Sequence, residues 1–130
     1  MEIQVLLKEN QKLEAHFNGF KVLSDQPADN KGDNTAPSPF DYFLASTAMC
    51  AGYFIKAYCQ PRGISTEGIT VTQINNKDAE NKYKQHIDIV VKVPETISEK
   101  DRIGIMRSIE GCSVKKAIQQ IPEIKIEVNS

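Results

Sequence analysis

Apolar and polar residues alternate over three short stretches at the beginning of the chain. These stretches, residues 2–7, about 13–18 and 20–24, are separated by the polar sequence KENQK and by Gly19. A period of two places successive side chains on opposite faces of a strand. The pattern therefore predicts three short strands joined as a meander or as a pair of hairpins.

A long polar segment, SDQPADNKGDNTAPSP, follows these strands and contains three prolines before Phe40. A loop of this length within a compact domain is usually functional or mobile. Its DNKGDN sequence does not fit a calcium loop, because the glycine and the acids fall at the wrong offsets.

A long apolar helix is predicted to begin after this loop. Ser38 provides the cap, Pro39 occupies the first helical position, and Asp41 closes a capping box. Residues 40–58 carry only two charges and are apolar or small on nearly every side of the helix. Such a helix has to be covered on most of its faces.

Two further strands are predicted in the second half of the chain, ITVTQI at residues 69–74 and YKQHIDIVVKV at residues 83–93. The second alternates, with Ile87 and Ile89 on the same face. We expect that face to be buried and the other to be solvated. His86 falls on the solvated face, which favours a surface role for this residue.

Two helices and a final strand are predicted after Pro94. The first helix has a capping signal at Ser98 and is interrupted at Gly111, and the second is short and ends before Pro122. Their apolar positions are Ile103, Met106 and Ile109 in the first helix and Val114, Ala117, Ile118 and Ile121 in the second. The closing IKIEV alternates as a strand. The order of elements predicts an α+β fold with a mostly antiparallel sheet around a long central helix.

Composition and charge narrow the class of protein. The 130 residues suit one domain, and 16 basic against 17 acidic residues give a formal net charge of -1. This balance argues against nucleic acid and against anionic membrane surfaces as partners. The sequence MEIQVLLKENQK lacks the basic and apolar regions of a signal peptide, and no apolar run is long enough to span a bilayer. We expect a single domain, residues 1–130, in the cytoplasm.

The three cysteines are odd in number and have no CxxC spacing, which argues against a disulfide scaffold and a structural zinc site. Cys59 lies nine residues after Cys50, on the opposite side of a helix, so the two cannot pair while the helix is intact. Its place beside the QPRG stop favours an inert residue.

Cys50 and Cys112 each allow two interpretations. Cys112 follows Gly111 and begins a short helix, where backbone N–H groups favour a thiolate, but its small size would also suit a helix start. Cys50 lies about three turns inside the long helix among small residues, so a molecule has room to approach its sulfur. Burial alone would raise the pKa of Cys50, and the local sequence supplies no cation to oppose that effect.

The sequences PFDYFLASTAMC, ending at Cys50, and CSVKKAI, beginning at Cys112, together with the order of strands and helices, resemble the OsmC/Ohr family of osmotically inducible and organic hydroperoxide resistance proteins. The resemblance covers essentially the whole chain. It implies an intertwined homodimer with the central helices packed back to back, which would also cover the apolar helix.

The resemblance also implies a chemistry that needs neither metal nor flavin, so no cofactor is expected. Cys50 would attack a hydroperoxide and become a sulfenic acid, and Cys112 would condense with it to form a disulfide. A dithiol reductant would then reopen that bond by exchange.

The sequence departs from the family's peroxidases at two positions. They carry a glutamate where this chain has Phe40, and an arginine from the N-terminal strands that has no counterpart here before Arg62. Asp41 can replace the glutamate or serve only as the capping acid. Other candidate cations are the side chains of His16, Lys21 and Lys31. The candidate catalytic residues are Cys50, Cys112 and Asp41.

Two other functions remain open. A binding protein of the same fold would hold a small hydrophobic or sulfur-containing ligand in the dimer cleft, with the cysteines lining it. A thiol hydrolase or transferase would use Cys50 as the acyl nucleophile, but neither histidine lies in a motif that identifies it as the base.

Overall fold

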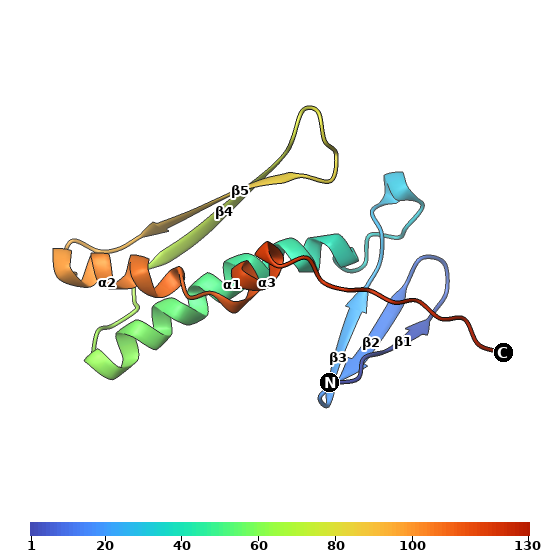
Figure 1. Cartoon of the computed structure of the whole chain (residues 1–130), viewed down its shortest axis with the longest axis horizontal. Helices are drawn as coiled ribbons and strands as arrows, with labels where there is room; N and C mark the ends of the chain where they lie inside the picture. Colours follow the sequence, from blue (N-terminus) through green and yellow to red (C-terminus); the bar gives the residue numbers. More distant parts are fainter. The chain divides into compact units, whose positions relative to one another are not determined.

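The structure is a computed structural model that describes all 130 residues of the chain (Figure 1). The chain forms two compact units, Met1–Ala45 and Ser46–Ser130. Helix α1, Pro39–Cys59, gives its first residues to the first unit and the rest to the second. None of the helices has the length and apolar character needed to cross a membrane.

The first unit contains a three-stranded antiparallel sheet, and the predicted meander is confirmed. Its strands are β1, Gln4–Leu7, β2, Leu13–Phe17, and β3, Phe20–Ser24, in the order β1-β2-β3. Asn18 and Gly19 join β2 to β3 with φ of 50° and 77°. Two consecutive left-handed residues are what a tight two-residue hairpin requires, which explains the Asn-Gly sequence.

The polar segment after β3 contains a short 3-10 helix, η1, Ala28–Asn30, and is closed by a buried carboxylate. Asp25 is only 1% exposed and accepts hydrogen bonds from the Thr35 hydroxyl at 2.7 Å, the Thr35 N–H at 3.0 Å and the Gln26 N–H at 2.8 Å. The Thr35 hydroxyl and the surrounding backbone N–H groups lower the pKa of Asp25 to about 2. One side chain therefore ties two distant points of this segment together.

The predicted cap of α1 is confirmed. The Asp41 N–H donates to Ser38 Oγ at 3.2 Å, and the Ser38 N–H donates to Asp41 Oδ2 at 3.2 Å. This reciprocal pair satisfies two of the backbone donors that a helix N-terminus leaves unpaired.

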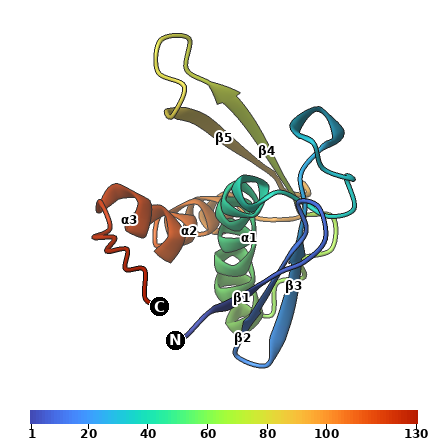
Figure 2. The ribbon, with the colours of Figure 1, turned by 90° about the vertical axis from the view of Figure 1, so that its right-hand side faces the viewer.

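The second unit contains a two-stranded antiparallel sheet of β4, Thr70–Lys77, and β5, Gln85–Lys92. The two strands run side by side as a ribbon in both views (Figures 1 and 2). Along β5 half-buried and exposed residues alternate, with Ile87 on the covered face, as predicted. His86 is exposed, as predicted, and its Nε2 lies 2.7 Å from Asp78 Oδ1.

The core of the second unit lies between α1, the loop before α2, and α2 itself, Glu99–Ile109. It consists of the buried residues Ile55, Cys59, Ile97 and Ile105. Ile105 is the residue that α2 buries, at 2% exposed, whereas Met106, expected on the apolar face, is 64% exposed. Gly104 explains why α2 turns Ile105 and not Met106 toward the core. Because Gly104 has no Cβ, the Tyr58 ring can lie directly against this helix.

Helix α3, Ser113–Gln119, is the last regular element, so the predicted final strand is wrong. The closing IKIEV forms neither helix nor strand, and Ile124 and Ile126 are 79% and 83% exposed. Alternation favours a strand, but a strand also requires a neighbour to bond with, and no strand of this chain pairs with the segment.

Candidate functional site

Helix α1 has one buried face and one exposed apolar face within the second unit. Every fourth residue from Thr47 through Ala51, Ile55 and Cys59 is buried. On the other side, Met49 and Tyr53 are each 64% exposed. Cys50 lies between these two faces and is half-buried.

The second cysteine of interest is positioned by the turn that ends α2. The Gly111 N–H donates to the Ser108 carbonyl at 3.0 Å, and a Cβ on Gly111 would lie 3.2 Å from that oxygen and 3.5 Å from the Phe54 ring. The Ser108 hydroxyl donates to the Phe54 carbonyl of α1 at 2.9 Å. This hydrogen bond attaches the end of α2 to α1 immediately before Cys112.

Cys112 caps α3 with its sulfur, and its predicted place at the helix start is confirmed. Its Sγ accepts a hydrogen bond from the Lys115 N–H at 3.4 Å, and the side chain is 3% exposed. A thiol is an unusual N-cap, since Ser, Thr, Asp and Asn are the usual ones.

The fold brings Cys50 and Cys112 together, although 62 residues separate them in the sequence. Burial opposes ionisation of Cys50, but hydrogen bonds from the Cys112 thiol and from the N–H groups of Val114 and Ser113 outweigh it and lower the pKa of Cys50. Burial, and then the thiol's role as donor to Cys50, raise the pKa of Cys112. The pair therefore favours a thiolate at Cys50 beside a protonated Cys112.

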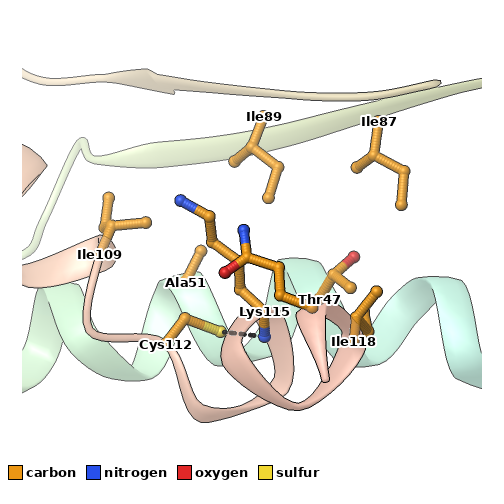
Figure 3. A pocket seen from close by; sticks show the side chains of 9 residues that line it. Thr47, Ala51, Ile87, Ile89, Ile109, Cys112, Lys115 and Ile118 are labelled. Carbon is orange, nitrogen blue, oxygen red and sulfur yellow. Dashed lines mark hydrogen bonds between the residues drawn. The ribbon is translucent and has the colours of Figure 1, made fainter. Parts of the chain in front are cut away.

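A cavity of about 350 Å³ adjoins this pair (Figure 3). Its apolar wall includes Ile87 and Ile89 of β5, and Cys112 and Lys115 approach it from the α3 side. The residues lining the cavity are Thr47, Ala51, Ile87, Ile89, Ile109, Cys112, Lys115, Ile118 and Gln119. Cys50 is not one of them. The cavity thus meets the pair at the Cys112 sulfur.

The other predicted residues do not line this cavity. Both contacts of Asp41 described above belong to the cap of α1. His16 Nε2 and Lys21 Nζ lie 2.7 Å and 3.2 Å from the carboxylate of Glu14. Lys31 ends η1 in a left-handed conformation with φ of 65°.

Cys59 and Arg62 lie away from the cavity described above. Cys59 is fully buried, and burial raises its pKa, in accord with the inert role expected for it. The Arg62 guanidinium lies 3.9 Å from the centre of the Tyr58 ring and donates to the Tyr58 carbonyl at 2.9 Å.

The sequence alone did not predict that Lys115 lines a pocket. The Lys115 side chain extends from α3 along the cavity and takes part in none of the chain's ion pairs (Figure 3). In the sequence, Lys115 is marked only by its position three residues after Cys112. That position does not predict that its side chain shares a cavity with β5, which is far away in the sequence.

The fold and the paired sulfurs define an α+β protein with two interacting cysteines on neighbouring helices. Residues 32–127 match the profile of the OsmC-like protein family, and this chain belongs to that family. Among curated proteins, none matches the chain.

Solved structures agree with this fold. An osmotic stress induced and detoxification response protein from Psychrobacter arcticus is 23% identical with a TM-score of 0.71, covering 88% of this chain and 85% of its own. An OsmC-like protein from Mycoplasma pneumoniae is 16% identical with a TM-score of 0.71, covering 98% and 93%. The organic hydroperoxide resistance protein OsmC from Legionella pneumophila is 17% identical with a TM-score of 0.59, covering 92% and 88%. At these identities the likeness shows the fold alone.

Proposed function

We propose that this protein reduces organic hydroperoxides with Cys50 as the attacking sulfur and Cys112 as the resolving sulfur. The observation that carries the proposal is the interaction of the Cys112 thiol with the Cys50 sulfur, which lowers the pKa of Cys50. It supports a pairing of the two sulfurs and favours the thiolate on Cys50. The name of the Legionella relative, an organic hydroperoxide resistance protein, supports the same substrate class.

The chemistry proceeds in two steps. The Cys50 thiolate attacks the terminal oxygen of the hydroperoxide, the O–O bond breaks, Cys50 becomes a sulfenic acid, and the alkoxide takes a proton and leaves as an alcohol. The Cys112 thiol then attacks the Cys50 sulfur, a disulfide forms, and water leaves. A dithiol reductant restores both thiols by exchange.

The missing arginine does not prevent the first step. Uncharged donors, the Cys112 thiol and the N–H groups of Ser113 and Val114, already lower the pKa of Cys50. Hydrogen bonds to the charged form of a group favour that form in the same direction as a nearby cation does. The contacts of Asp41 account for it as a capping residue, so we assign it to the cap.

We propose that a second copy of the chain covers the exposed side of α1. Met49 and Tyr53 lie one turn apart and are both 64% exposed. An exposed aromatic residue beside an exposed methionine on one helix face is typical of an interface. Light scattering should give a molecular mass of twice 14.5 kDa for the wild type and of 14.5 kDa for the Tyr53→Glu variant. The control Lys100→Glu changes the charge of an exposed residue of α2 and should stay dimeric. A wild-type mass of 14.5 kDa would refute the homodimer.

Thiol counting tests the peroxidase. The protein is mixed with one equivalent of cumene hydroperoxide, unfolded, and titrated for free thiols. Two of the three thiols should disappear in the wild type, and both remaining thiols should disappear in the matched control Cys59→Ala. Cys50→Ser should lose none, and Cys112→Ala should stop at a sulfenic acid that dimedone labels at Cys50.

The cavity supports a second candidate function, the binding of a small hydrophobic or sulfur-containing ligand. Its volume of about 350 Å³ falls in the range of small-molecule sites, and its lining is mostly apolar. If all three thiols survive equimolar hydroperoxide, the peroxidase is refuted and this binding function is favoured.

A further inference from the structure

The cavity beside the cysteine pair has a single cation in its lining. Lys115 extends from α3 along the cavity and is the only lysine, arginine or histidine among the lining residues (Figure 3). It takes part in none of the ion pairs of the chain. Most of the lining is apolar and includes isoleucine side chains of β5, α2 and α3. Apolar surroundings screen a charge less than water does, so this ammonium group interacts strongly with negative charge nearby.

The direction of the proposed first step brings the leaving group into this cavity. A sulfur that attacks the terminal oxygen of a hydroperoxide approaches along the O–O bond, so the leaving oxygen lies on the side away from the sulfur. The cavity meets the cysteine pair at Cys112. The organic part of a hydroperoxide that reaches Cys50 from the cavity therefore lies among the isoleucine side chains. Its leaving oxygen then emerges in the space that Lys115 lines.

The leaving oxygen needs a proton donor that the donors around Cys50 do not supply. The Cys112 thiol and the N–H groups of Ser113 and Val114 interact with the sulfur of Cys50. They stabilise the charge of the thiolate before the reaction, whereas cleavage of the O–O bond moves negative charge onto the alkoxide oxygen. An alkoxide is a strong base, so an acid that protonates it as the bond breaks accelerates the step.

We propose that Lys115 is the general acid of the hydroperoxide reduction and donates a proton from its Nζ to the leaving alkoxide oxygen. This inference rests on the proposed function. The Cys50 thiolate bonds to the terminal oxygen, and the electron pair of the O–O bond goes to the inner oxygen. That oxygen takes the proton from Nζ and leaves as the alcohol, while Cys50 carries the terminal OH as a sulfenic acid. The neutral amine of Lys115 then takes a proton from solvent.

The other polar side chains of the lining are poorer proton donors. The Thr47 hydroxyl donates its only proton to Gln73 Oε1, so toward the cavity it acts as an acceptor. The Gln119 amide donates hydrogen bonds but is neutral and keeps its protons. An ammonium group has three N–H donors and can release one proton. Among these side chains Lys115 alone combines a positive charge with a transferable proton.

Two oxidants with different leaving groups test the proton transfer. Cumene hydroperoxide releases an alkoxide, which needs a proton, whereas perbenzoic acid also carries an aromatic ring but releases benzoate, which is stable without one. The full chain is mixed with each oxidant in a single turnover, and the reaction is stopped at set times with N-ethylmaleimide. Mass spectrometry of the tryptic peptide that ends at Lys56, which contains Cys50 and neither other cysteine, gives the rate of thiol loss.

Lys115→Gln should slow the reaction of Cys50 with cumene hydroperoxide about 100-fold, as expected for the loss of a general acid, and should slow the reaction with perbenzoic acid much less. Lys116→Gln is the matched control, because this lysine is next in α3 and does not line the cavity. It should change neither rate.

The other outcomes separate this inference from the proposed function. Equal slowing with both oxidants would mean that Lys115 acts on the thiolate or on the fold, and would overturn the proposal. An unchanged rate with cumene hydroperoxide would also overturn it, while the peroxidase would stand. A wild-type protein that keeps its thiols in cumene hydroperoxide but loses them in perbenzoic acid would refute the proposed function, and this inference with it.

Lys115→Arg separates proton donation from the effect of charge. Arginine keeps the positive charge but does not release a proton in proteins. The variant should therefore react with cumene hydroperoxide nearly as slowly as Lys115→Gln. Recovery of the wild-type rate would leave Lys115 with a purely electrostatic effect and would overturn its role as the acid.

Discussion

Gly104 in α2 is a position where one added methyl group is expected to destabilise the packing of α2 on α1. A Cβ there would lie 2.1 Å from Tyr58 Oη and 2.2 Å from Tyr58 Cζ, far inside contact distance. The ring cannot easily move away, because its hydroxyl donates to Asp101 at 2.9 Å and the Arg62 guanidinium lies over its face. Gly104→Ala must therefore push α2 away from α1 or break these contacts.

The magnitude follows from two opposing effects. Alanine in place of glycine inside a helix gains about 1 kcal/mol, while overpacking a filled site costs about 1–3 kcal/mol. A clash of this depth belongs at the upper end of that cost. The net loss should be about 2 kcal/mol, and the broken hydrogen bond of Tyr58 adds to it.

Urea unfolding followed by circular dichroism measures this loss. With a denaturant slope of about 2 kcal/mol per molar for a protein of this size, the midpoint should fall by about 1 M. All variants are compared at one protein concentration, because dimerisation would make stability depend on it. Since the turn that ends α2 leads directly to Cys112, the variant should also form the Cys50–Cys112 disulfide more slowly with diamide.

A double-mutant cycle separates the clash from other effects. In the Tyr58→Ala background the space is empty, so adding Gly104→Ala should be neutral or stabilising by about 1 kcal/mol. A single Gly104→Ala variant as stable as the wild type, or the same loss in both backgrounds, would refute the reasoning.

Three further outcomes are expected. Cys112→Ala removes a hydrogen bond to the Cys50 sulfur, so the pKa of Cys50 should rise and its alkylation by iodoacetamide should begin at higher pH; an unchanged profile contradicts this. Because the pKa of Asp25 falls from 3.8 to about 2 on folding, its stabilisation is complete above pH 4 or so and disappears as the pH falls through about 2. Asp25→Asn should remove this part of the loss in the free energy of unfolding at acid pH, and it should speed hydrogen exchange of the Thr35 amide. Buried Cys59 should resist iodoacetamide until the protein unfolds, and labelling at native conditions would contradict its burial.

Local features of the fold were predictable because their causes are local. The cap at Ser38 and Asp41 depends on residues three apart, and the alternation along β5 depends on a period of two. The face that α2 buries was not predictable in the same way. It depends on the Tyr58 ring lying against Gly104, a contact between residues far apart in the sequence.

The meeting of the two sulfurs is also a long-range event. No periodicity links Cys50 to Cys112, and only the resemblance to a family suggested that they meet. For the IKIEV segment the local pattern predicted a structure that does not form. Its residues alternate as in a strand, but no strand of the chain pairs with it. Likewise, the groups that lower the pKa of Cys50 include the backbone N–H groups of Ser113 and Val114, whose positions depend on the tertiary fold and not on the local sequence.

The cap of α3 is made by a sulfur atom, and this couples the oxidation state of the protein to the order of a helix. Cys112 Sγ accepts the Lys115 N–H in the reduced protein. A disulfide sulfur is a poorer acceptor than a thiol or thiolate sulfur, so we expect the first turn of α3 to fray if Cys112 is bonded to a second sulfur. Amide exchange at Lys115 would then serve as a built-in indicator of the redox state, readable without any label or substrate.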